Sequence, residues 1–173
     1  MPDWLTHIVI GLILIEIFNV RKKSLVLIGT ILPDILPKII LLGLFFALPD
    51  FNYEIFNAFH IPFVLFLVTL LIAPLFRYDY WKVVLLINIG VISHFLADAL
   101  LRHFSTAGVR LLYPFKFKAY SANLVWPDQS YFILIPAVIV YIVIILLKKK
   151  YSAKDIKKES VKTSHELRVK EHI

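Results

Sequence analysis

The chain has 173 residues, of which 60% are hydrophobic and only 18% are charged, and its mean hydropathy is +0.80. This balance is unlike that of an ordinary soluble domain and is typical of an integral membrane protein. The sequence contains no cysteine, which excludes disulfide bonds and thiolate–metal sites. The formal net charge is +7.

Five apolar segments follow one another along the chain, and most approach the roughly 20 residues that cross a hydrocarbon core. They are residues 5–18, 25–48, 59–76, 83–101 and 131–147. We therefore predict an all-α polytopic membrane protein with about five transmembrane helices. Residues 1–147 would form this domain, and residues 148–173 a basic, flexible cytoplasmic tail.

Basic residues mark alternate polar segments. The turn at 19–23 has three, residues 77–82 have two and the tail has nine, which together are 14 of the 19 lysines and arginines. The positive-inside rule then predicts a multi-pass protein of the inner or plasma membrane, with its N-terminus outside and its C-terminus cytoplasmic. The tail is better interpreted as a topology anchor than as a contact for anionic lipid or RNA. Membrane lipid is the expected environment, and no nucleic acid partner is expected.

Ionisable residues inside apolar segments are costly, so they normally face one another, a cavity or an ion. His94 and Asp98 are four residues apart and share one helical face. Asp34 lies in ILPDILP, where two prolines free backbone groups of the helix. The ionisable residues of this kind are His7, Asp34, His60, His94 and Asp98. Counted at about 1.5 Å per residue, Asp34 is at mid-depth and the other four fall in the outer half of the bilayer.

Three histidines and two aspartates without a sulfur ligand are typical of a zinc site, with manganese or iron as less favoured metals. The alternative is a polar network that joins the helices through hydrogen bonds. A single intramembrane His or Asp is more often structural. The convergence of five such residues from four segments favours the metal site.

Several stretches resemble the YdjM-like family of membrane-bound metal-dependent hydrolases: MPDWLTHIVIG, ILPDI, FHIPF and GVISHFLADALLRHFSTAGVRLLYPF. The resemblance covers roughly residues 1–118. It is strongest over 90–115, where the family's residues occur in order as Gly90, His94, Asp98, Gly108, Pro114 and Phe115. The family in turn distantly resembles zinc-dependent phospholipase C. The resemblance implies that the five residues above are metal ligands and that the protein hydrolyses an ester, above all a phosphoester of a lipid or its headgroup.

Two positions depart from the family pattern. Leu36 stands where the family often has a second aspartate, and Ile55 where it often has the first histidine of a pair. We therefore expect one tightly bound divalent ion. A weaker second site would need Asp50, Glu54 or another residue as a substitute.

A bound zinc ion lowers the pKa of its water from 15.7 to about 7, and Asp34 or Asp98 would then act as the catalytic base. Charge developing on a phosphoryl oxygen needs cations. The segment after Asp98 offers four as substrate-binding residues, although they could equally contact lipid headgroups. They are Arg102, Arg110, Lys116 and Lys118. His103 is better interpreted as an interfacial residue.

Two functions of other classes stay open. A transporter or metal-ion carrier could use the same cluster as its binding site, but the sequence has no internal repeat of the kind that transporters show. A non-catalytic membrane scaffold would use the cluster only to hold its helices together.

Overall fold

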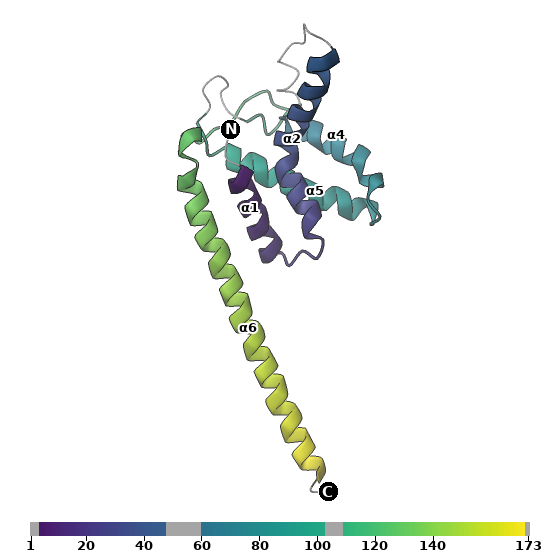
Figure 1. Cartoon of the computed structure of the whole chain (residues 1–173), viewed down its shortest axis with the longest axis vertical. Helices are drawn as coiled ribbons and strands as arrows, with labels where there is room; N and C mark the ends of the chain where they lie inside the picture. Colours follow the sequence, from purple (N-terminus) through teal and green to yellow (C-terminus); the bar gives the residue numbers. More distant parts are fainter. Residues whose placement is uncertain (1–3, 48–59, 103–108, 172–173) are drawn as a thin grey trace.

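The computed structural model describes residues 4–47, 60–102 and 109–171. These residues form five α-helices and two short 3₁₀ helices, with isolated β-bridges but no strand (Figure 1). The all-α prediction is confirmed for this part of the chain. The elements are α1 (Trp4–Ile17), α2 (Lys23–Ala47), α4 (Pro62–Ile72), η1 (Ala73–Leu75), α5 (Tyr80–Asp98), η2 (Pro127–Gln129) and α6 (Tyr131–Glu171).

Helices α2 and α5 pack against each other through glycine. A Cβ atom added at Gly29 would collide with the backbone carbonyl of Ile87, and one added at Gly90 with the carbonyl of Val26. Small residues of this kind let two backbones approach closely, as in many membrane helix pairs. The close contact brings the backbone of α2 within reach of the side chains on the last turns of α5.

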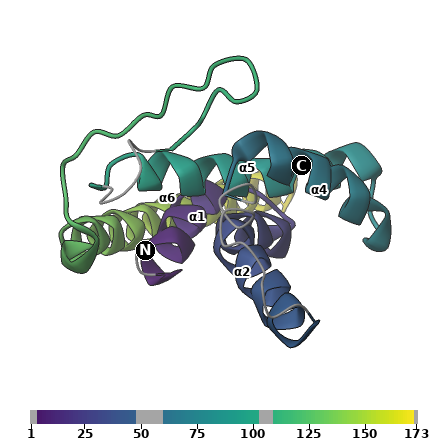
Figure 2. The same cartoon turned by 90° about the horizontal axis from the view of Figure 1, so that it is seen from above.

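A core of apolar side chains surrounds this contact. Leu25, Leu65, Val83, Ile87 and Phe95 are buried there, and they come from α2, α4 and α5. The three helices therefore form one packed unit, α1 packs against α2 and α5 of that unit, and α6 packs against α1 (Figures 1 and 2).

Helix α1 lies beside the first half of α6 (Figure 1). At the far end of α1 the carboxylate of Glu16 pairs with Lys23 of α2 at 2.7 Å and with Lys148 of α6 at 3.0 Å. The two pairs connect three helices at one end of the bundle.

Two helices in the described ranges are both long and apolar enough to cross a membrane: Tyr80–Asp98, and residues Tyr131–Tyr151 of α6. Half of the first is buried within the protein, as in the core helix of a soluble protein, but only 6% of the second is. Helix α1 and the Pro62–Leu75 segment are apolar but shorter. The prediction of five spans is thus matched for two segments, and the others rest on the sequence.

Helix α6 continues to Glu171, through the basic region expected to begin at residue 148. Figure 1 shows its second half extending away from the other helices. The backbone of the basic region is thus helical as far as Glu171, while its flexibility stays a prediction.

Candidate metal centre

All five ionisable residues singled out in the sequence come together at one end of the bundle. They come from four places: the start of α1, the middle of α2, the turn before α4, and the last turns of α5, which supply both His94 and Asp98. Four are almost completely buried, with exposed fractions of 2% or less, whereas the side chain of His60 is 32% exposed. The members are His7, Asp34, His60, His94 and Asp98, and we call them the His/Asp cluster.

Asp98 lies between the three imidazoles. Its Oδ2 is 2.8 Å from Nε2 of His60 and 3.2 Å from Nε2 of His94, and its Oδ1 is 3.4 Å from Nε2 of His7. The rings of His7 and His94 stack with their centroids 3.8 Å apart.

The backbone of α2 orients two of these rings. Nδ1 of His94 lies 2.8 Å from the carbonyl oxygen of Thr30, and Nδ1 of His60 lies 3.5 Å from that of Pro33. A carbonyl can only accept, so each Nδ1 donates its proton to α2, and this fixes the ring with Nε2 directed at Asp98. Metal-binding histidines are held in this way, with the second nitrogen donating to a backbone carbonyl or a carboxylate.

The acceptor for His60 exists because of a proline. In an α-helix the carbonyl of residue 33 normally accepts the N–H of residue 37. Residue 37 is a proline inside α2, which has no N–H, so the carbonyl of Pro33 has no partner of that kind and is free to accept from His60. The sequence motif ILPDILP therefore places a carboxylate and a free carbonyl on the same helix turn.

Asp34 is the most unusual member. Both of its carboxylate oxygens are buried, and neither has a hydrogen-bond partner among the residues that the structure describes. The same is true of both ring nitrogens of His7 and of Nε2 of His94. Buried polar atoms are normally paired, and an unpaired buried carboxylate is especially costly.

These atoms have the spacing that a metal ion requires. His7, His94 and Asp98 each offer one ligand atom, all within 4.8 Å of one another, and Asp34, His60 and His94 do the same. Two atoms that each lie about 2.0–2.2 Å from a zinc ion are roughly 3–4 Å apart. Imidazole nitrogens and carboxylate oxygens are also a donor set that zinc accepts, so the residues present fit a divalent metal.

Charge leads to the same conclusion. In their ionised forms Asp34 and Asp98 would bring two negative charges into a buried site. Such an arrangement is unfavourable unless a cation lies between the groups. A divalent ion would balance both carboxylates.

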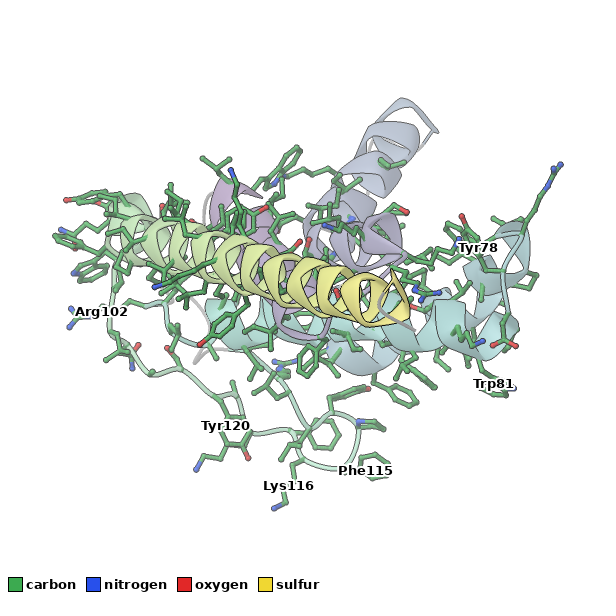
Figure 3. The ribbon with its side chains drawn as sticks, turned by 90° about the horizontal axis from the view of Figure 1, so that it is seen from below. Tyr78, Trp81, Arg102, Phe115, Lys116 and Tyr120 are labelled. Carbon is green, nitrogen blue, oxygen red and sulfur yellow. The ribbon has the colours of Figure 1, made fainter. Side chains whose placement is uncertain are left out.

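The four basic residues after α5 are not part of the His/Asp cluster. The guanidinium of Arg102 stacks over the ring of Trp126 and its Nε donates to the carbonyl of Asn123, while Lys118 lies over Tyr120. Figure 3 shows Lys116 on a loop that projects from the helices, apart from Arg102. Their role in substrate binding stays a prediction, and His103, Asp50, Glu54 and Ile55 lie outside the described residues.

Sequence reasoning missed the backbone acceptors of the centre. Thr30 and Pro33 act through their carbonyls, which no side-chain pattern identifies. Proline at position 37 was the available signal for the second, since it removes the usual partner of that carbonyl. Gly29 and Gly90 bring α2 close to α5. The sequence could have predicted this contact only from their being small residues in apolar segments.

Comparisons with protein-family models, with curated proteins and with solved structures find no match for this chain. The geometry of the His/Asp cluster and the sequence motifs are therefore the basis for inferring the function of the protein.

Proposed function

We propose that the protein is a membrane-bound, metal-dependent hydrolase that acts on a phosphoester of a lipid or its headgroup. The observation that carries the proposal is the buried carboxylate of Asp34, which has no hydrogen-bond partner among the described residues and has a ligand atom within 4.8 Å of those of His60 and His94. The resemblance of residues 1–118 to the YdjM-like hydrolases supports the class of reaction.

His7, His94 and Asp98 would hold the ion, with His60 and Asp34 completing the site, and zinc is the metal we favour for this donor set. When bound, such an ion supplies Lewis acidity and lowers the pKa of a bound water toward about 7. Thr30 and Pro33 hold the two rings of His94 and His60 in orientation.

Asp34 is better placed than Asp98 to take a proton from the attacking water. Both oxygens of Asp34 lack a hydrogen-bond partner in the described ranges, whereas Asp98 already contacts three imidazoles. A carboxylate that must accept a proton needs an oxygen within hydrogen-bond reach of the water. We assign Asp98 to positioning and metal binding, and Asp34 to proton transfer.

In the proposed placement the chain spans the membrane several times, with the cluster at the outer side and the C-terminal end of α6 in the cytoplasm. The support is the distribution of basic residues along the sequence and the exposed apolar surface of α6, where Ile135, Ile139, Val143 and Leu146 are 47–59% accessible. Arg102, Arg110, Lys116 and Lys118 would then face the same side as the cluster and attract anionic substrates.

The test is metal analysis of the purified protein combined with a hydrolysis screen of phospholipids and phosphomonoesters. About one tightly bound divalent ion per chain and metal-dependent release of a phosphate-containing product would support the proposal. A protein that binds the ion but hydrolyses nothing in the screen would favour the carrier function. A protein verified to be metal-free, whose melting temperature does not respond to zinc, would leave only the scaffold.

A further inference from the structure

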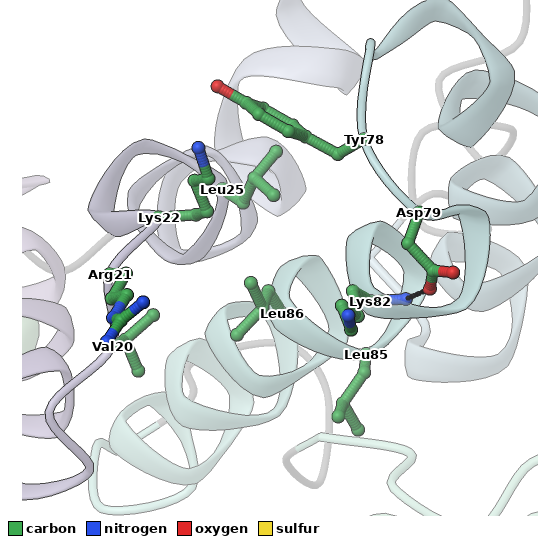
Figure 4. Close-up of a pocket in the computed structure, with 9 residues that line it drawn as sticks. All are labelled: Val20, Arg21, Lys22, Leu25, Tyr78, Asp79, Lys82, Leu85 and Leu86. Atoms are coloured by element: carbon green, nitrogen blue, oxygen red, sulfur yellow. Dashed lines mark hydrogen bonds between the residues drawn. The ribbon is translucent and has the colours of Figure 1, made fainter.

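A cavity lies at the other end of the bundle from the His/Asp cluster. It has a volume of about 480 Å³ and lies between the turn that joins α1 to α2 and the start of α5 (Figure 4). From Lys82, beside this cavity, to Asp98 is sixteen residues of α5, or about 24 Å along the helix. The two sites are therefore separate.

Positive charge surrounds this cavity. Arg21, Lys22 and Lys82 line it and are exposed, and the ammonium of Lys22 lies 4.2 Å above the ring of Tyr78. The one acidic residue in the lining, Asp79, accepts the backbone N–H of Lys82 and so caps α5. Three cations face one carboxylate that already has a partner, so the mouth of the cavity is suited to an anion such as phosphate.

The floor of the cavity is apolar. Leu25 and Leu86 lie toward each other between α2 and α5, and Val20 adds to this surface from the turn (Figure 4). On the outer face of α5, Leu85 and Trp81 are 61% and 69% exposed. A ligand with a phosphate and a hydrocarbon chain would therefore bind both the basic residues at the mouth and the apolar floor. Inorganic phosphate or a nucleic acid backbone would bind only the basic residues.

We propose that this cavity binds an anionic phospholipid, with the phosphate between Arg21, Lys22 and Lys82 and the first part of an acyl chain along Leu25 and Leu86. Basic pockets between helices at a membrane surface recognise anionic lipids by this combination. The proposal shares the membrane placement with the proposed function but does not depend on the metal centre. Its success or failure can therefore be separated from that of the hydrolase.

The test titrates phosphatidylglycerol into the protein in a neutral detergent and counts bound lipid by native mass spectrometry. One basic residue beside an anionic headgroup contributes about fivefold in affinity, so Arg21→Gln with Lys82→Gln should weaken binding by about 25-fold. Both side chains are exposed, and an unchanged melting temperature without added lipid will show that the variant is folded. Phosphatidylcholine should bind much more weakly than phosphatidylglycerol.

The matched control is Lys149→Gln with Lys150→Gln, which removes the same charge from exposed positions on α6. It should retain the wild-type affinity. An equal loss in the control would mean general attraction to anionic lipid and would overturn the proposal. Displacement of the lipid by inorganic phosphate, or binding of an RNA oligonucleotide at the same residues without binding of phosphatidylglycerol, would also overturn it.

Discussion

At the scale of single residues, the pairing of histidine nitrogens separates a metal centre from a structural network. In a structural network each ring would use both nitrogens in hydrogen bonds with other side chains or the backbone. Here His60 uses both nitrogens, Nδ1 on the carbonyl of Pro33 and Nε2 on Asp98, whereas His94 uses only Nδ1, and His7 has neither nitrogen in a hydrogen bond within the described ranges. His7, His94 and Asp98 each bring one ligand atom within 4.8 Å of the others, which is a group that could hold a cation.

His94 belongs to both possible ligand sets, so we expect His94→Ala to lower metal affinity by more than about 100-fold, the upper end of what the loss of an outer hydrogen-bond partner costs. Isothermal titration of the metal-free protein with zinc measures the change. Ser93→Ala serves as the control, because its hydroxyl donates to the carbonyl of Gly90 within α5 and not to the cluster. Equal zinc affinity in wild type and His94→Ala would contradict the metal centre.

The two aspartates should respond differently to replacement by asparagine. Asp34→Asn should keep metal bound through His7, His94 and Asp98 and lose turnover by about 100-fold or more, because proton transfer to a carboxylate typically contributes at least that much. Asp98→Asn should lose the metal itself. Metal content and hydrolysis rate, measured on the same preparations, separate the two effects. A metal-free Asp34→Asn protein would reverse the assignment.

At the scale of elements, α2 is the helix that organises the centre. It supplies Asp34 as a side chain, two carbonyls as ring acceptors, and Gly29 as the contact that lets α5 come close. Two prolines within one helix would ordinarily be destabilising by about 3 kcal/mol each. Their position around Asp34 indicates that α2 has a local geometry suited to the site at the expense of regular helix hydrogen bonding.

Replacing Pro37 tests this idea directly. Pro37→Ala restores an N–H that can bond to the carbonyl of Pro33 and draw it back along the helix, away from His60. We expect a higher melting temperature in the metal-free protein and about tenfold weaker zinc binding.

The control for Pro37 is Pro136→Ala, at a proline inside α6 and so in a different helix. It should raise stability without changing zinc affinity. If both variants bind zinc as the wild type does, the freed carbonyl has no role in the centre.

At the scale of the whole molecule, the exposed apolar side chains indicate where lipid would lie. The first half of α6 is apolar and almost unburied, which is unfavourable in water and favourable in a bilayer. The Glu16 pairs with Lys23 and Lys148 mark one end of the bundle, and the His/Asp cluster marks the other. The membrane normal is thus expected to run roughly from one to the other.

The absence of native cysteine makes the orientation easy to measure. A cysteine at Lys116, in the loop after α5, should react with an impermeant maleimide in intact cells, and one at Tyr151 in α6 should react only after lysis. Both positions are exposed. The opposite pattern would place the His/Asp cluster on the cytoplasmic side and reverse the proposed topology.

Sequence alone predicted the helices and the members of the cluster, because charged residues in apolar segments are few and have few favourable partners. It did not predict how the cluster is held. The ring acceptors are backbone carbonyls of Thr30 and Pro33, and their availability depends on helix geometry and on contact between α2 and α5. The partners of Glu16 were also missed, since the contact with Lys148 joins residues 132 positions apart.

Helix α6 has 41 residues, which at 1.5 Å each makes a rod of about 60 Å. A hydrocarbon core is only about 30 Å thick, so in the proposed placement roughly half of the rod stands clear of the bilayer. Electrostatic attraction in physiological salt fades over about 8 Å. The C-terminal end of the rod would therefore lie beyond the range at which the charged lipid surface acts.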